Sequence, residues 1–234
     1  RMEGLETTPS SLASAEQRRG RAGRQCPGSC IRLWSPAEQQ RRPRFHPPEL
    51  LLADPQPVLM ELAQWGAGLG DELPWLDPPP AAAMQEGQRG LQQLGLLEED
   101  GRISARGRLT SGLGVHPRIG MLLLEAHERG SPQLGCDLAA ILSERDPFDT
   151  RQIGSDLEVR LSGIQRHHSL RALSQQLRRQ LKRLGPSPQH KGSSVNAGDL
   201  ILAAFPEWLA QQRPDQTGRY QLRQGRGAVL LPWD

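Results

Sequence analysis

Leucines recur every three or four residues between positions 170 and 184, and this spacing constrains the fold more than any other feature of the chain. Residues spaced in this way lie on one face of an α-helix, so the pattern predicts an amphipathic helix with its apolar stripe in a core. The stripe consists of Leu170, Leu173, Leu177, Leu181 and Leu184. The other side carries Arg171, Arg178, Arg179, Lys182 and Arg183, and by default such a charged face is solvated surface.

Further helical patterns make the chain mainly α with small β elements. Apolar spacing predicts helices over 58–65, 84–94 and 134–142, and the run Ile119 to Ala126 is apolar on nearly every face, as in a buried helix. His116-Pro117 has the form of a helix start. Asp100-Gly101 predicts a small hairpin over 96–103, and a second hairpin is expected over 220–231. The helices and the hairpin before residue 115 together suggest a winged helix.

Composition excludes several classes of protein. The 234 residues are 36% hydrophobic, which suits a folded protein, but no apolar run approaches the roughly 20 residues of a membrane helix. The start of the chain also lacks the apolar core of a signal peptide, so we expect a cytoplasmic protein with no membrane partner. Cys26, Cys30 and Cys136 lack metal-ligand spacing and are expected to be free thiols. The histidines are isolated or adjacent to one another, and no metal site is expected.

The charge balance permits a nucleic-acid partner without requiring one. The formal net charge is +3, and all but Lys182 and Lys191 of the 29 basic residues are arginine. Genomic base composition can produce such a bias, so the arginine content by itself indicates little.

The segment from Gln17 to Arg24 reads QRRGRAGR and combines four arginines with two glycines. The guanidinium of arginine offers a rigid fork of donors that stays charged, and this suits the oxygens of a phosphate. Gly20 and Gly23 remove side-chain bulk, which would let the backbone turn sharply between the arginines. On composition alone, a solvated basic face or an RNA-binding tail is the favoured interpretation of the segment.

The same eight residues match the pattern Q-R-x-G-R-x-G-R and so resemble the sixth conserved motif of DEAH-box helicases of superfamily 2. The preceding SSLASAEQ resembles the helix that leads into this motif. The following PGSCIRLWS resembles the strand that closes the second RecA-like domain, and Ser29 to Trp34 carries a short strand pattern of its own. The resemblance implies that Gln17 helps to place the attacking water. It implies that Arg21 and Arg24 are arginine fingers on the γ-phosphate of ATP.

The resemblance extends along essentially the whole chain. Within the DEAH-box family, the sequence most resembles the bacterial HrpB-type helicases. It rests on the phrases LMELAQWG, ELPWLDPPP, LQQLGLLEEDGRISARGRLTSGLGVHPRIGMLLLEA and GRYQLRQGRGAVLL. Pro55 is a departure, because the family more often has an aliphatic residue there, and the departure puts in doubt the contact of the winged helix with the RecA-like domain.

The resemblance and the patterns together predict four regions. Residues 1–35 are expected to end a RecA-like α/β domain, and 36–115 to form a winged-helix domain entered through a Pro-rich linker over 39–48. Residues 116–213 are expected to form a helical bundle like the ratchet domain that faces the single strand in DEAH helicases. Residues 214–234 are expected to start an OB-like barrel.

The expected function is therefore that of a fragment of an ATP-dependent RNA helicase. ATP and Mg²⁺ are the implied cofactors. No G-x-x-x-x-G-K-[ST] phosphate loop occurs in the sequence, so the chain alone is expected to be inactive and to complete an ATP site with a missing N-terminal RecA-like domain. Single-stranded RNA is the implied partner, with DNA possible. Two alternatives remain open, namely a non-catalytic nucleic-acid-binding module derived from a helicase and another DEAH-box subfamily.

Overall fold

The computed structural model of the protein describes residues 8–149, 153–187, 195–214 and 216–230. Its chain divides into two compact units. The smaller unit contains residues 8–53 together with Trp75–Pro80. The larger unit contains Asp54–Pro74 and the described residues from Ala81 onward.

The smaller unit is built on α1 (Leu12–Ala22), α2 (Pro36–Arg41) and a short 3-10 helix over Glu49–Leu51. The predicted helix after Ser11 is confirmed, but it continues through the glycine-containing motif to Ala22. Gly20 is helical, so the sharp turn expected there is wrong. At Gly23, which has a φ of −114°, the helix ends in a turn, as expected. The favourable geometry of a continuous helix outweighs the cost of one internal glycine, which is roughly 1 kcal/mol relative to alanine.

The strand expected at Ser29 to Trp34 is absent from the described structure of this unit. Ile31 and Leu33 are 83% and 92% exposed. A strand is stabilised by hydrogen bonds to a neighbouring strand, and no described residue pairs with this segment, so its alternating pattern has nothing to pack against.

The Pro-rich stretch over 39–48 is more ordered than a linker. Its first residues belong to α2, whose start is a capping box in which the Ser35 hydroxyl accepts from the Glu38 amide and the Glu38 carboxylate accepts from the Ser35 amide. Its later residues return to the start of α1, where Pro43 and Arg44 accept backbone hydrogen bonds. The sequence pattern misses this because the hydrogen-bond partners lie about 30 residues away.

The larger unit begins with α3 (Gln56–Trp65), α4 (Ala81–Gln93) and α5 (Ala105–Ser111). α3 ends as predicted at Gly66, which has a φ of 77° that only glycine adopts readily. The predicted hairpin is present as a bridge between Leu97 and Ile103, and it lies between α4 and α5. Pro55 packs against α4, since a Cβ at Gly87 would lie 2.8 Å from its Cγ.

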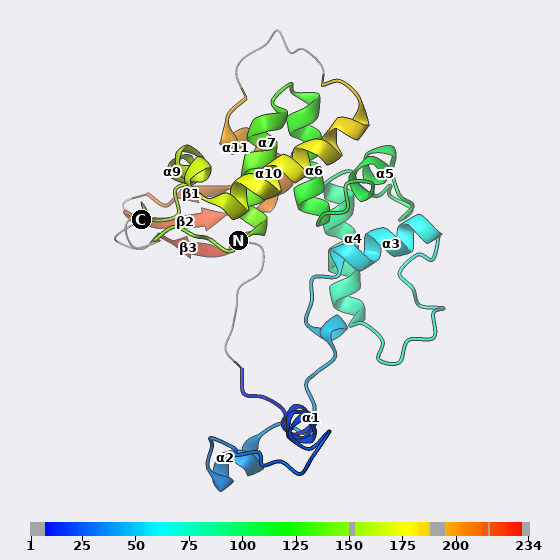
Figure 1. The fold of residues 1–234 in the computed structure, drawn as a ribbon. Helices are drawn as coiled ribbons and strands as arrows, with labels where there is room; N and C mark the ends of the chain where they lie inside the picture. The colour runs from blue at the N-terminus through cyan, green and yellow to red at the C-terminus, as the bar shows by residue number, and fades with distance from the viewer. Residues whose placement is uncertain (1–7, 150–152, 188–194, 215, 231–234) are drawn as a thin grey trace. The chain divides into compact units, whose positions relative to one another are not determined.

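A helical bundle follows and contains the core of this unit (Figure 1). Its helices are α6 (Pro117–Glu128), α7 (Pro132–Ser143), α9 (Leu157–Gly163), α10 (His168–Leu181) and α11 (Ala197–Ala204). The predictions for α6, α7 and α10 are confirmed. His116 caps α6 through its Nδ1, which accepts from the Arg118 amide at 3.2 Å. Leu170, Leu177 and Leu181 are buried, as the leucine stripe requires.

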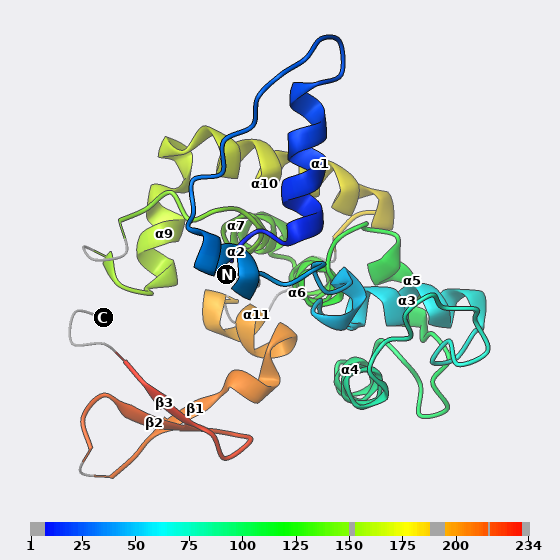
Figure 2. The same ribbon diagram turned by 90° about the horizontal axis from the view of Figure 1, so that it is seen from below.

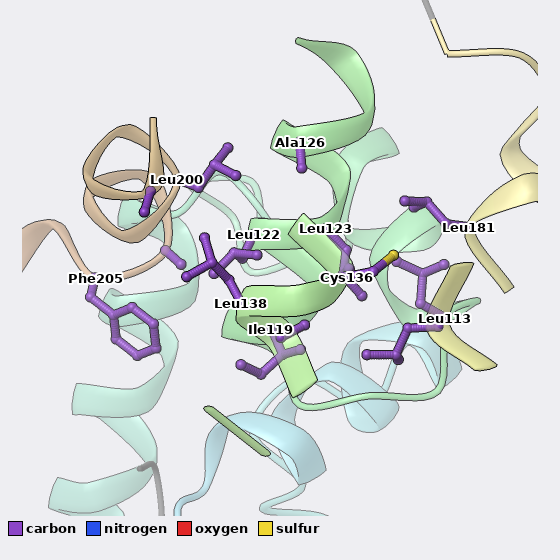
Figure 3. Packing of buried hydrophobic residues seen from close by; sticks show 14 residues of the cluster. Leu113, Ile119, Leu122, Leu123, Ala126, Cys136, Leu138, Leu181, Leu200 and Phe205 are labelled. Carbon is purple, nitrogen blue, oxygen red and sulfur yellow. The ribbon is translucent and has the colours of Figure 1, made fainter. Parts of the chain in front are cut away.

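α6 and α7 lie at the centre of this core (Figure 3). The side chains of Leu122, Leu123, Leu138 and Cys136 meet there, with Phe205 and Leu181 on opposite sides. The two helices approach closely, because a Cβ at Gly135 would lie 2.3 Å from the Ala126 methyl group. Only a residue without a side chain fits that crossing.

A three-stranded antiparallel sheet follows the bundle (Figure 2). The strands β1 (Ala210–Gln212), β2 (Arg219–Leu222) and β3 (Gly227–Val229) lie in sequence order. The β2–β3 hairpin confirms the predicted hairpin within residues 220–230, while residue 231 lies outside the described residues, and the hairpin turn has Gly225 at a φ of 84°. β1 was not predicted, because its residues are exposed and lack an apolar alternation.

Arg118 joins three parts of the larger unit. Its Nε donates to Gln56 Oε1 of α3 at 3.1 Å, and its Nη1 donates to the carbonyl oxygen of Ala204, the last residue of α11, at 2.8 Å. Nη1 also lies 2.7 Å from Glu207 Oε1, and the Arg118 and Glu207 side chains are only 15% and 16% exposed. The guanidinium carbon lies 5.4 Å from the Phe205 ring centroid. One side chain thus ties α3, α6 and the approach to the sheet together.

Within the described ranges, no helix is both long enough and apolar enough to cross a membrane.

Candidate functional site

The helix that carries the candidate ATP-site residues is held at its start by residues far along the chain. An α-helix leaves its first four amide groups without partners inside the helix. In α1, the Ser11 amide donates to His46 Nε2 at 3.1 Å, and the Ser14 amide donates to Ser11 Oγ at 3.2 Å. The Leu12 and Ala13 amides donate to the carbonyl oxygens of Pro43 and Arg44 at 2.9 and 3.0 Å. All four groups are therefore satisfied, three of them by the segment Arg42–His46, which we call the capping segment.

Two further contacts hold the middle and the end of α1. The Glu16 carboxylate is paired with Arg32 of the following loop and with Arg19, whose Nε lies 2.8 Å from Glu16 Oε2. At the end of the helix, Gly28 approaches so closely that a Cβ there would lie 2.0 Å from the Ala22 carbonyl oxygen. Gly28 is thus the glycine of this region that a close backbone approach requires.

The candidate residues Gln17, Arg21 and Arg24 are all exposed. Gln17 and Arg21 are four residues apart in α1, so they project about 40° apart around its axis, while the buried Ala15 lies roughly opposite. Arg24 follows the last helical residue by two positions. The structure therefore brings Gln17 and Arg21 together on the outward face of the helix.

These side chains are also uncommitted. Among the described residues, Gln17, Arg21 and Arg24 form no side-chain hydrogen bond or ion pair. The local carboxylate, Glu16, is occupied by Arg19 and Arg32 instead. The donors of Arg21 and Arg24, which we call the arginine pair, are thus free to bind an anion supplied from outside this unit.

The donor set suits the terminal phosphate of a nucleotide. Two guanidinium groups can each make paired, charge-assisted hydrogen bonds to phosphate oxygens, and the primary amide of Gln17 can both donate to and accept from a water molecule. The part of the chain that the structure describes holds no cluster of three or more His, Cys, Asp or Glu side chains able to bind a metal ion.

The basic side of α10 divides into committed and free residues. Arg178 donates to Gln133 Oε1 at 2.6 Å, as part of a network in which Ser174 Oγ donates to Asp137 at 2.5 Å. Arg171 donates to the Gln165 carbonyl oxygen at 3.3 Å. Three basic residues have no such partner among the described residues and form what we call the α10 basic patch. They are Arg179, Lys182 and Arg183.

Two histidine contacts were not predicted from the sequence. His46 was read as an isolated histidine, but its Nε2 accepts the Ser11 amide at the start of α1. His116, in addition to capping α6, lies 3.2 Å from Asp54 Oδ2 through its Nε2. Burial raises the pKa of Asp54, but the hydrogen bonds from His116 and from the Gln56 amide outweigh it and leave the pKa below its ordinary value. No local pattern reveals these roles, because the partners are distant in sequence.

Comparison with known proteins shows which proteins this chain resembles. No protein-family model matches it. It is 39% identical over 226 residues to the ATP-dependent RNA helicase HrpB of Escherichia coli K12, an alignment that covers 97% of this chain. A crystal structure of the Escherichia coli DEAH/RHA helicase HrpB superposes on 95% of this chain with a TM-score of 0.74 and 34% identity. Nearly the whole of this chain is therefore similar to one region of the DEAH helicase HrpB.

Other DEAH-type relatives match a smaller share of the chain. The ATP-dependent RNA helicase HrpA of Escherichia coli is 35% identical over 152 residues, which is 63% of this chain. The probable ATP-dependent RNA helicase DHR2 of Saccharomyces cerevisiae is 34% identical over 64% of this chain. The alignment with HrpB therefore covers more of this chain than the alignments with these two relatives.

The chain spans about a quarter of the relatives it matches most fully. It covers 26% of the length of HrpB and 27% of the chain in the HrpB crystal structure. The mainly helical fold with a small antiparallel sheet agrees with that region of HrpB.

Proposed function

We propose that this chain is a segment of an ATP-dependent RNA helicase of the HrpB type, and that Gln17, Arg21 and Arg24 complete its ATP site. The names of the relatives support the activity, since HrpB and HrpA are both called ATP-dependent RNA helicases. The remaining walls of the site, including a phosphate loop, would belong to an N-terminal RecA-like domain of the same protein.

One observation carries the proposal. Gln17 and Arg21 stand together on the outward face of α1, Arg24 follows them, and none of the three is engaged by a described residue. Basic residues that serve only as solvated surface do not need to share one face in this way. Arg19 of the same helix differs from Arg21 and Arg24, because it pairs with Glu16.

The roles follow from the chemistry of the side chains. ATP with Mg²⁺, when bound, supplies the phosphoryl group that is transferred to water. Arg21 and Arg24 donate hydrogen bonds to the γ-phosphate oxygens and balance the charge that builds on them in the transition state. The Gln17 amide orients the attacking water. Loss of the γ-phosphate removes the anion that the arginine pair binds, which would release the two RecA-like domains from each other.

The larger unit is proposed to contact the RNA. We assign residues 36–115, of which 36–53 lie in the smaller unit, to a winged-helix domain. We assign 116–213 to a ratchet-like bundle and 214–234 to the start of an OB-like module, in a cytoplasmic protein. The α10 basic patch offers three uncommitted cations for the backbone phosphates of a single strand of RNA, and DNA offers the same phosphates.

The decisive experiment is Arg24→Ala in the full-length protein. Loss of an arginine finger is expected to lower the kcat of RNA-stimulated ATP hydrolysis by at least roughly 10³-fold. Arg19→Ala is the matched control, because Arg19 lies in the same motif but pairs with Glu16 and is well exposed. Its kcat should stay near that of the unaltered protein.

Near-normal hydrolysis by Arg24→Ala would refute the assignment. If the unaltered full-length protein bound RNA without hydrolysing ATP, the function would instead be that of a non-catalytic RNA-binding module.

A further inference from the structure

The capping segment is anchored by a side chain that the proposed function has not used. Arg42 Nη1 donates to both the carbonyl oxygen and the hydroxyl of Ser10, at 3.0 and 3.1 Å. Ser10 directly precedes the residue that caps α1. Arg42 thus fixes the start of the segment to the point where the chain enters the helix.

Arg42 is itself held in place from the other side. Its guanidinium carbon lies 3.9 Å from the centroid of the Trp34 ring, a cation–π contact. The Trp34 Nε1 in turn donates to Gln39 Oε1 at 2.7 Å, so α2 fixes the ring. The Nε of Arg42 is buried without a hydrogen-bond partner among the described residues. A residue kept only for surface charge would not carry that cost.

The contacts that hold α1 avoid the face that carries the candidate ATP-site residues. The capping segment engages its start, Arg32 engages Glu16 in the middle, and Gly28 lies against its end. Gln17 and Arg21 project from the outward face. The helix is therefore held by contacts at its start, middle and end, and the arginine pair remains accessible.

We infer that Arg42 is a positioning residue for the arginine pair, acting through the start of α1. The inference rests on the proposed function, because it concerns the orientation of Arg21 and Arg24 toward a nucleotide. Arg42 touches neither of them and acts by fixing the axis of the helix that carries them.

The size of the expected effect follows from the geometry of the helix. α1 has 11 residues and so is about 16 Å long at 1.5 Å per residue. A tilt of about 5° at its start moves its far end by about 1.4 Å. A displacement of about 1 Å can cost roughly 10²-fold in rate. Removing the anchor should therefore lower kcat by roughly 10- to 100-fold.

The test is Arg42→Met in the full-length protein, which keeps the length of the side chain and removes its donors and charge. We expect the kcat of RNA-stimulated ATP hydrolysis to fall by roughly 10- to 100-fold. The KM for ATP should change by less than about threefold and RNA affinity should be unchanged, because ground-state contacts remain. Arg41→Met is the matched control, since Arg41 is the exposed neighbouring residue at the end of α2, and it should leave kcat unchanged.

A double substitution separates positioning from a general loss of structure. If Arg42 acts through the arginine pair, Arg42→Met should lower the residual turnover of Arg24→Ala very little further. Arg42→Lys, which retains a donor for Ser10 but loses the planar stacking group, should give a kcat between those of the unaltered protein and Arg42→Met. Its melting temperature should match that of the unaltered protein.

The outcomes also separate this inference from the proposed function. If Arg24→Ala abolishes turnover while Arg42→Met and Arg42→Lys behave like Arg41→Met, the positioning role is overturned and the proposed function stands. A full further loss in the double variant also overturns the positioning role, because Arg42 would then act independently of Arg24. Near-normal turnover by Arg24→Ala overturns both.

Discussion

Replacing Arg118 with methionine should destabilise the larger unit more than any exposed charge substitution. The change removes the cation that pairs with Glu207, the donor to Gln56 Oε1 and the donor to the Ala204 carbonyl oxygen. Methionine retains a long apolar side chain, so packing against Phe205 is largely preserved. The experiment therefore isolates the polar contacts.

The magnitude follows from the burial of the partners that remain. The Glu207 side chain is 16% exposed and Gln56 is buried, so both would lose their partner where water is scarce. Breaking a largely buried ion pair by removing one partner costs roughly 3 to 5 kcal/mol. For a unit of this size, that corresponds to a fall in melting temperature of roughly 6 to 20 °C.

Urea denaturation followed by circular dichroism measures this loss, with Arg89→Met as the control. Arg89 forms an ion pair with Glu86 in which both side chains are largely exposed, so its removal should change the free energy of unfolding by less than about 0.5 kcal/mol. If the two variants are equally stable, Arg118 does not join the parts of the unit as described.

Three further predictions concern the larger unit. Burial raises the pKa of Glu125, but hydrogen bonds from two arginines outweigh this effect and lower the pKa below its ordinary value of 4.5. The ionised carboxylate therefore stabilises the fold above pH 4.5, and this stabilisation is lost as the pH falls. In urea titrations, Glu125→Gln should show a smaller loss of stability below pH 4.5 than the unaltered protein. Burial raises the pKa of the Cys136 thiol to about 12, so a thiol reagent at pH 8 should label the exposed Cys26 and Cys30 at once and Cys136 only after unfolding, and immediate labelling of all three would contradict the described core. Replacing each member of the α10 basic patch by alanine should reduce the slope of log K against log salt for single-stranded RNA by about 0.7, and an unchanged slope would exclude that residue from the RNA contact.

Local periodicity predicted most of the helices of the larger unit. The leucine stripe over 170–184 and the apolar run over 119–126 each carry enough repeats to fix both the helix and its buried face. The strand pattern at Ser29 to Trp34 failed because a strand depends on a neighbour, and its pattern says nothing about whether one is present. β1 was missed for the converse reason, since its pairing with β2 gives it order that its exposed residues do not signal.

The candidate site was predictable in its residue types but not in its supports. The spacing of Gln17, Arg21 and Arg24 was visible in the sequence, and the structure adds that the first two share an outward helix face. Arg42 and His46 act on Ser10 and Ser11 across more than 30 residues. Nothing in the local sequence distinguishes such residues from an ordinary Pro-rich connection.

The distant capping of α1 also sets when this helix can form during protein synthesis. With 11 residues, α1 is shorter than the roughly 12 to 15 residues that a helix needs to be even marginally stable alone in water. A growing chain that ends at Ala22 has not yet produced His46, which follows 24 positions later. At roughly 5 to 20 residues per second, the ribosome adds those positions in about one to five seconds. The contacts from the capping segment can therefore stabilise α1 only after these later residues have been synthesised.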